Sequence, residues 1–301
     1  MMIKTVKMVG RMRGLAQAAH SSGKSALVAQ QGSAAPNRLD SVFDRLKAEN
    51  KKALIIYLMA GDPTLDDTKR LVLALEGAGA DIIELGVPFS DPIADGPVIQ
   101  RAAQRALANG VSLRAILAMV KSLRLRTKIP IVLMLYYNSV CAMGYETFCQ
   151  AAKDAGVDGV IVPDMPPDEA GPLKGPAEEA GLRLIFLLAP TSTAARRAFV
   201  ARRSRGFLYY VSLTGITGAK LTDIADVGQK VEKIKKIARA PIAVGFGVAT
   251  PEDAARVSQF ADGVIVGSAV VRRIEECCHA PDMVEQVAEF VTSLKTAMTQ
   301  K

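Results

Sequence analysis

Eight short apolar runs recur along the chain after residue 40, and stretches with helical spacing separate most of them. The runs are rich in Val, Ile and Leu without regular polar alternation, which is typical of parallel strands covered on both faces. The predicted strands span 54–59, 81–86, 131–135, 158–162, 183–188, 206–211, 241–245 and 262–266. The predicted helices include Ser41 to about Glu49, Leu65–Glu76, Ala102–Leu125, Tyr145–Ala155 and Asp223–Ile237.

Short repeated turns lead from helices into strands. They read AGAD at 78–81, AGVDG at 155–159 and FADG at 260–263, and two further strands begin after a Pro. Gly commonly ends a helix, and Pro is tolerated at the start of a strand. Eight such units in about 260 residues favour an α/β fold of the (β/α)8 barrel type. An open doubly wound sheet is the alternative, although no G-x-G-x-x-G follows an early strand.

The net charge of +8 is distributed unevenly. Residues 1–39 contain six basic residues and no acidic residue, whereas 40–301 carry a net charge of only +2. The sequence therefore predicts a disordered basic extension over 1–39 and a barrel catalytic domain over 40–301. An organelle transit peptide, an upstream start codon and a flexible tail are three open explanations of the extension. The nearly neutral body argues against a nucleic-acid partner, and no apolar run reaches the ~18 residues of a membrane span.

The cysteines offer no metal-binding pattern. Cys141, Cys149, Cys277 and Cys278 form no C-x-x-C, and His279 lacks further ligands at metal spacing. We expect reduced thiols, no metal and a cytoplasmic location, or import into an organelle if the extension is a transit peptide.

Glu84 interrupts the apolar run of the second predicted strand. Strand alternation places Glu84 on the same face as Ile82. If Ile83 and Leu85 meet the helices, Glu84 points into the barrel near the carboxyl ends of the strands, where barrel active sites lie. A desolvated carboxyl there has a raised pKa suited to proton transfer. The alternative is a structural Glu paired with a Lys or Arg.

An irregular loop over 87–96 follows this strand, and Pro97 suits the first position of the next helix. Its acidic residues, Asp91 and Asp95, have an ordinary explanation as turn formers that hydrogen-bond their own backbone. For Asp95 a second carboxylate role is also plausible, because paired carboxylates in different environments are a common acid/base arrangement.

Small residues follow the sixth, seventh and eighth predicted strands. They are SLTGITGA at 212–219, GFG at 245–247 and Gly267-Ser268, where a helix is expected to begin. Backbone N–H groups can approach an anion closely in such loops, and a helix N-terminus adds partial positive charge. Because barrels commonly bind phosphate after their last strands, the sequence predicts a phosphorylated substrate held without metal.

The run ELGVPFSDPIADGP over 84–97 resembles the signature of the tryptophan synthase alpha subunit family. The resemblance extends to GDP at 61–63, YYN at 136–138, PDMP at 163–166 and the loops after the last three strands. It covers roughly residues 40 to 295 and implies a (β/α)8 barrel. The implied activity is a lyase reaction of tryptophan biosynthesis, the retro-aldol cleavage of indole-3-glycerol phosphate to indole and glyceraldehyde 3-phosphate.

The resemblance implies roles for individual residues. Glu84 resembles the general acid/base that protonates C3 of the indole ring and takes the proton of the substrate hydroxyl. Asp95 resembles the carboxylate that accepts the indole N–H, and Tyr209 a Tyr whose phenol lies close to the acid/base. The implied phosphate-binding residues are Gly218, Gly247, Gly267 and Ser268, and the implied indole pocket is Tyr57, Met134 and Phe246.

A beta subunit is the partner that the resemblance implies, in an αββα heterotetramer. Pyridoxal phosphate belongs to that partner, and the alpha subunit needs no cofactor. The positions implied to lie toward the interface or in mobile lids are Pro88, Asp91, Asn138 and Thr217. Two other functions stay open: a free-standing indole-3-glycerol phosphate lyase, and a mainly regulatory subunit, against which the joint presence of Glu84, Asp95 and Tyr209 argues.

Overall fold

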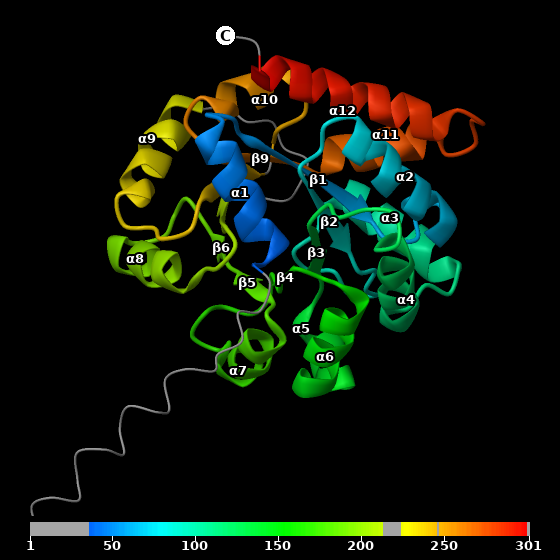
Figure 1. Cartoon of the computed structure of the whole chain (residues 1–301), viewed down its shortest axis with the longest axis horizontal. Helices are drawn as coiled ribbons and strands as arrows, with labels where there is room; N and C mark the ends of the chain where they lie inside the picture. Colours follow the sequence, from blue (N-terminus) through cyan, green and yellow to red (C-terminus); the bar gives the residue numbers. More distant parts are fainter. Residues whose placement is uncertain (1–35, 213–223, 246, 300–301) are drawn as a thin grey trace, which may run out of the picture. The chain divides into compact units, whose positions relative to one another are not determined.

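The computed structural model describes residues 36–212, 224–245 and 247–299, in which helices surround one parallel sheet (Figure 1). The strands are β1 Ala53–Met59, β2 Ile82–Gly86, β3 Ile131–Met134, β4 Gly159–Ile161, β5 Arg183–Ile185, β6 Leu187–Leu188, β7 Leu208–Val211, β8 Ile242–Gly245 and β9 Gly263–Val266. The helices are α1 Arg38–Ala48, α2 Leu65–Gly77, α3 Pro97–Ala108, α4 Leu113–Leu123, α5 Tyr137–Met143, α6 Tyr145–Ala155, α7 Gly171–Ala180, α8 Ala194–Arg203, α9 Ile224–Lys235, α10 Pro251–Ser258, α11 Ser268–Cys277 and α12 Met283–Thr299.

The sheet closes into a barrel. Its strand order is β5-β4-β3-β2-β1-β9-β8-β7-β6, and the neighbouring strands run parallel. The two strands at the ends of this order, β5 and β6, are separated in the sequence by Phe186 alone. The Phe186 carbonyl accepts the backbone N–H of Tyr209 in β7 at 3.1 Å. The predicted fifth strand, 183–188, is therefore one strand interrupted at Phe186, and the predicted (β/α)8 barrel is confirmed.

The buried side chains form two hydrophobic layers, one inside the barrel and one between the strands and the surrounding helices. The interior layer contains every second residue of the strands, including Ala53, Ile55, Ile82, Val132, Ile161, Ile185, Ala243 and Ile265. Helix α1 belongs to this layer through Leu39, Phe43 and Leu46. The Phe43 and Phe207 ring centroids lie 5.9 Å apart, just before β7 begins. Helix α1 thus closes the amino-terminal end of the barrel and leaves the carboxyl end for the site.

Helix α1 begins at Arg38, three residues before the predicted start at Ser41. The Asn37 side chain caps the helix by accepting the Leu39 N–H at 2.9 Å. Apolar periodicity does not report this start, because a cap is a local hydrogen bond rather than a buried face.

The predicted single helix Ala102–Leu125 is wrong, because two helices, α3 and α4, occupy this stretch. Helix α3 ends before Asn109, and Gly110 adopts a positive φ of 70°. The Ser112 side chain then caps α4 by accepting the Ala115 N–H at 3.3 Å. The two helices are bent by 92°, and no single described helix is long and apolar enough to cross a membrane.

Three aspartates share one arrangement at the amino-terminal end of the barrel. Each of them stands directly before a strand, in the repeated turns of the sequence: Asp81 before β2, Asp158 before β4 and Asp262 before β9. Their Oδ2 atoms accept the backbone N–H groups of Leu54, Ile131 and Ile242 on the neighbouring strands at 2.8, 2.8 and 2.9 Å. Their carboxylates also pair with Lys295, Arg124 and Lys235 at 2.5, 3.0 and 3.1 Å. Each aspartate therefore aligns two strands and attaches a helix to them.

Candidate active site

Glu84 lies in β2 with its side chain directed into the barrel. Ile83 and Leu85 belong to the outer layer and Ile82 to the interior layer, as strand alternation predicts. Glu84 is fully buried, and neither of its carboxyl oxygens has a hydrogen-bond partner among the described residues. Burial, and then the charge of Asp95, raises the pKa of Glu84 to about 8. No Lys or Arg among the described residues pairs with Glu84, as the alternative of a structural Glu would require.

Asp95 lies in the loop between β2 and α3 and is partly buried. Burial raises the pKa of Asp95 to about 6, and a hydrogen bond from Tyr136 opposes that rise. The Gln100 side-chain amide donates to the Asp95 backbone carbonyl at 2.8 Å, and the Asp95 N–H donates to the Pro92 carbonyl at 3.0 Å. The loop thus brings a second carboxyl group close enough to Glu84 to act on its pKa.

Tyr57 in β1 and Tyr209 in β7 approach the same two carboxyl groups. Burial is the main reason that the pKa of each phenol is raised, and the charges of Glu84 and Asp95 add to it. Register places Tyr57 directly beside Glu84. The structure therefore brings together the three predicted catalytic residues, Glu84, Asp95 and Tyr209. Tyr57, a residue of the predicted indole pocket, lies with them.

Two glycines make room for these phenols: Gly86, to which the sequence analysis assigned no role, and Gly245, which it placed only in the predicted anion-binding run at 245–247. A Cβ on Gly86 would lie 2.0 Å from the Tyr57 hydroxyl, and a Cβ on Gly245 would lie 2.6 Å from the Tyr209 hydroxyl. Both distances are far below a van der Waals contact, so any side chain there would displace a phenol. The glycine of the E-L-G run was the available signal, since a Gly inside a strand often marks a close approach.

Tyr136 is a further residue at the site that the sequence reasoning did not single out. It lies two residues after the end of β3, is 5% exposed, and accepts the Ala94 N–H of the loop that carries Asp95. The YYN run was noted only as part of the family resemblance, because nothing in it indicates which of two adjacent tyrosines faces the barrel mouth.

Three of the predicted phosphate residues, Gly247, Gly267 and Ser268, lie at the same end of the barrel. Gly247 follows β8 with a φ of 81°, and Ser268 is the first residue of α11, as predicted. Gly267 precedes it without a side-chain cap, and a Cβ there would lie 3.6 Å from the Tyr57 Cβ. The first turn of α11 therefore opens next to Tyr57, with backbone N–H groups that no capping side chain occupies.

Of the remaining predicted site residues, four are described by the structure and three are not. Met134 ends β3, is half-buried, and pairs in register with Gly86. Pro88 is buried, whereas Asp91 and Asn138 are exposed in the segments after β2 and β3. Three predicted site residues lie outside the described residues: Gly218, Thr217 and Phe246.

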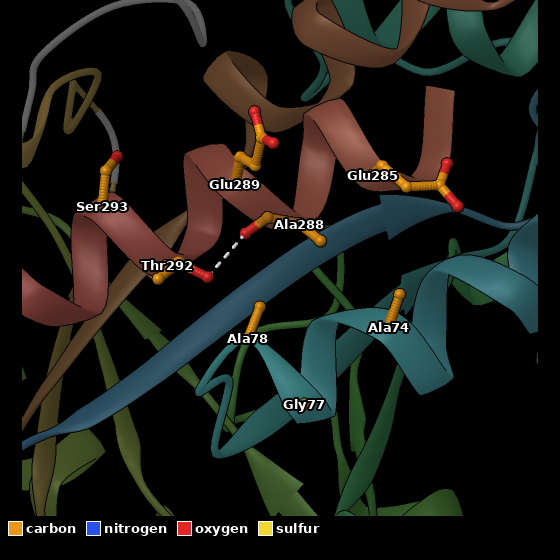
Figure 2. A pocket seen from close by; sticks show the side chains of 8 residues that line it. All are labelled: Ala74, Gly77, Ala78, Glu285, Ala288, Glu289, Thr292 and Ser293. Carbon is orange, nitrogen blue, oxygen red and sulfur yellow. Dashed lines mark hydrogen bonds between the residues drawn. The ribbon is translucent and has the colours of Figure 1, made fainter. Parts of the chain in front are cut away.

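A separate groove of about 510 Å³ lies between α2 and α12 (Figure 2). Ala74 of α2 and Ala78, which directly follows this helix, point toward α12. The Thr292 hydroxyl donates to the Ala288 carbonyl at 3.0 Å. Its small side chains indicate a seam where two helices pack closely, away from the carboxyl ends of the strands. Within the described ranges no group of three or more His, Cys, Asp or Glu could hold a metal ion.

Comparisons with known proteins agree with this geometry. A sequence model of the family "Tryptophan synthase alpha chain" matches residues 43–299. The tryptophan synthase alpha chain of Geobacter sp. (strain M21) is 50% identical over 259 residues, which cover 86% of this chain and 97% of that protein. The crystal structure of the alpha subunit from Legionella pneumophila str. Paris superimposes with a TM-score of 0.82 at 41% identity, covering 88% and 99% of the two chains. A structure of Mycobacterium tuberculosis tryptophan synthase gives 0.81 at 38% identity, covering 88% and 100%.

The family model spans the barrel from α1 to α12, so it includes every strand that contributes to the site. The similarity to the relative from Geobacter extends over nearly the whole of that protein, which excludes a match to one shared segment. The chain therefore belongs to the tryptophan synthase alpha chain family, the indole-3-glycerol-phosphate lyase of tryptophan biosynthesis.

Proposed function

We propose that Glu84 is the general acid/base of the lyase reaction in this chain and that Asp95 is its electrostatic partner. The burial of Glu84 beside Asp95, without a hydrogen-bond partner among the described residues, carries this proposal. A carboxyl group with a pKa of about 8 is protonated at neutral pH and can donate its proton. A carboxyl group with a pKa of about 6 is mainly ionised there and can stabilise positive charge.

The reaction then proceeds in two proton transfers. Glu84 first donates its proton to C3 of the indole ring, which becomes tetrahedral, while Asp95 accepts the ring N–H as positive charge develops on the nitrogen. The Glu84 carboxylate next takes the proton of the substrate hydroxyl. The carbon–carbon bond to C3 breaks, its electron pair restores the aromatic ring, and the hydroxyl carbon becomes the aldehyde. Glu84 ends with the proton it gave up.

The substrate phosphate is assigned to Gly247, Gly267 and Ser268, together with Gly218. The uncapped first turn of α11 supports this assignment, because free backbone N–H groups at a helix N-terminus attract anions. Anchoring the phosphate there positions the indole end of the substrate at the two carboxyl groups. Tyr209 lies beside Glu84, and the proposed indole pocket is Tyr57, Met134 and Phe246.

Replacement of Glu84 by Gln tests the catalytic role. We expect Glu84→Gln to lower the rate of indole release by about 10²–10⁴-fold, the usual contribution of general acid/base catalysis, while the substrate still binds. Asp95→Asn is expected to reduce the rate more than the affinity. Glu285→Gln, an exposed carboxylate on α12, serves as the matched control and leaves the rate unchanged. Turnover of Glu84→Gln near that of the unmodified chain would refute the proposed mechanism.

The pH profile offers a second readout of the same assignment. Activity requires an ionised Asp95 and a protonated Glu84, so kcat/KM should rise near pH 6 and fall near pH 8. In Glu84→Gln any residual activity should lose the fall near pH 8.

Assembly with a beta subunit as an αββα heterotetramer is also proposed. Tryptophan synthase structures from M. tuberculosis, which include an alpha chain with its beta partner, match this chain. The alpha chain carries no cofactor, and pyridoxal phosphate belongs to the beta chain. The exposed positions of Asp91, in the loop after β2, and Asn138, in α5, support a contact surface there that also includes Pro88. Thr217, the fourth implied position, lies outside the described residues.

Indole release measured with and without a beta subunit tests the assembly. The proposal expects co-purification and a faster release in the complex. Equally strong release by the isolated chain would instead identify a free-standing lyase. Binding of the beta subunit without any cleavage would identify a mainly regulatory subunit.

A cytoplasmic location is the remaining proposal. Cys141, Cys149, Cys277 and Cys278 are free thiols, as in a reducing compartment. The basic extension over 1–39 is the feature that would favour organelle import instead. Mass spectrometry of the native N-terminus would decide whether the mature protein contains residues 1–39 in addition to the proposed barrel domain over 40–301.

A further inference from the structure

Tyr136 joins the barrel to the loop that carries Asp95. The phenol oxygen accepts the Ala94 backbone N–H at 2.9 Å, and the phenol lies near enough to the Asp95 carboxyl group to lower its pKa. A phenol has one proton, and the Ala94 N–H can only donate. The bond from Ala94 therefore leaves the Tyr136 proton available to the Asp95 carboxyl group, whose pKa the phenol lowers.

The Tyr136 ring holds the same loop at a second point. The rings of Tyr136 and Phe89 are stacked, with centroids 5.1 Å apart and planes at 23°. Phe89 lies near the beginning of the loop and Asp95 at its end. Gln100 fixes the Asp95 backbone from α3 at 2.8 Å. The loop is thus held by Tyr136 at Phe89 and Ala94, and the Asp95 main chain is held by Gln100.

We propose that Tyr136 is a positioning residue, which orients the Asp95 carboxylate toward the substrate N–H through its single O–H donor. This inference rests on the proposed role of Asp95. A donated hydrogen bond favours the ionised carboxylate, so it opposes the effect of burial on the pKa of Asp95. Tyr136 thereby keeps Asp95 ionised, while Glu84, which accepts no such bond from any described residue, keeps its proton.

The conservative variant Tyr136→Phe removes the hydroxyl and keeps the ring that stacks on Phe89. We expect kcat for indole release to fall by about 10–100-fold, since hydrogen bonds to charged groups are among the stronger ones. KM should change by less than about threefold, because the phosphate anchor is untouched. The rising limb of the kcat–pH profile should move to higher pH, since Asp95 loses the donor that lowers its pKa. Tyr137→Phe is the matched control: the Tyr137 hydroxyl contacts the Tyr145 hydroxyl at 2.7 Å, and the variant should behave as the unmodified chain does.

A double-variant cycle separates positioning from a general structural effect. In single-turnover measurements, Tyr136→Phe should cost nothing further when Asp95 is already Asn, because its effect acts through the carboxylate. An equal loss in both backgrounds, or an unmoved pH limb, would overturn the proposal. If Asp95→Asn releases indole slowly and Tyr136→Phe releases it at the rate of the unmodified chain, only the role of Tyr136 would be refuted. Full activity of Asp95→Asn would instead refute the role of Asp95 and the positioning role together.

Discussion

Carboxyl groups lie at both ends of the barrel, and their surroundings are opposite. At the amino-terminal end Asp81, Asp158 and Asp262 accept a backbone N–H and pair with a cation. At the carboxyl end Glu84 has no hydrogen-bond partner among the described residues, and its neighbouring carboxyl group, Asp95, repels its charge. The same kind of side chain therefore stabilises one end and, in the proposed mechanism, supplies a proton at the other.

The difference follows from how each end satisfies a buried charge. Burial raises the pKa of Asp158 too, but the Ile131 N–H and the guanidinium groups of Arg38 and Arg124 oppose the rise. For Glu84 no described residue opposes the rise, so burial and the charge of Asp95 act in the same direction. A buried carboxyl that the fold leaves unpaired is a cost to stability, and such groups are found where catalysis needs them. The two ends should accordingly respond in opposite ways when a carboxylate is removed.

Asp158→Ala should produce the largest loss of stability. The Asp158 side chain is 3% exposed and that of Arg124 13%, so the variant leaves a buried cation unpaired. Removing one partner of a buried ion pair typically costs about 3–5 kcal/mol. We expect that decrease in the free energy of unfolding, measured by urea denaturation at neutral pH. Asp158→Asn is the control, because its amide oxygen can still accept the Ile131 N–H, and it should lose less. A loss below about 1 kcal/mol for Asp158→Ala would contradict the contrast between the two ends.

Glu84→Gln should instead stabilise the fold at neutral pH. The folded-state pKa of about 8 exceeds the ordinary value of 4.5, so between these values the unfolded chain loses a proton that the folded chain keeps. Stability from this group is complete below about pH 4.5 and is lost as pH rises to about 8, at about 1.4 kcal/mol per pH unit. At pH 7 the variant should regain up to about 3 kcal/mol. Urea denaturation from pH 5 to pH 8 checks this. The decrease in the free energy of unfolding with pH should be less steep in Glu84→Gln, by the contribution of one proton, about 1.4 kcal/mol per pH unit. An unchanged dependence would mean that Glu84 is not buried in its neutral form.

The barrel itself could be predicted from the sequence, because the apolar runs and helix periods are local signals repeated eight times. The strand bounds agree to within about two residues, and the orientation of Glu84 follows from alternation in β2 alone. The long predicted helix Ala102–Leu125 failed for a physical reason: apolar spacing continues through Asn109 and Gly110, where the backbone turns. Apolar periodicity indicates which face of a helix is buried, but it does not indicate where the helix axis changes direction.

The site could be predicted only where residues are adjacent in the sequence. Glu84 and Asp95 lie in one run, so their chemistry was visible together. The contacts of Tyr136 with Ala94 and Asp95 join residues about forty positions apart, and the spacing of a single chain cannot reveal them. The partners of Asp81 and Asp262 were hidden for the same reason, although the turns that contain them were recognised as repeats.

Asp262→Ala should have the smallest effect and tests whether exposure sets the scale at the amino-terminal end. The Asp262 side chain is 33% exposed and that of Lys235 is 27% exposed, so water screens this pair far more than it screens Asp158 with Arg124. The variant also loses the acceptor of the Ile242 N–H, 2.9 Å away. We expect a loss of about 1 kcal/mol in the free energy of unfolding, most of it from that hydrogen bond. Lys235→Gln separates the two contributions, because it removes the charge partner and keeps the acceptor. It should cost only a few tenths of a kcal/mol, less still in 1 M salt. If Lys235→Gln were as destabilising as Asp262→Ala, the ion pair rather than the strand N–H would be the stabilising contact, and exposure would not explain the difference from Asp158.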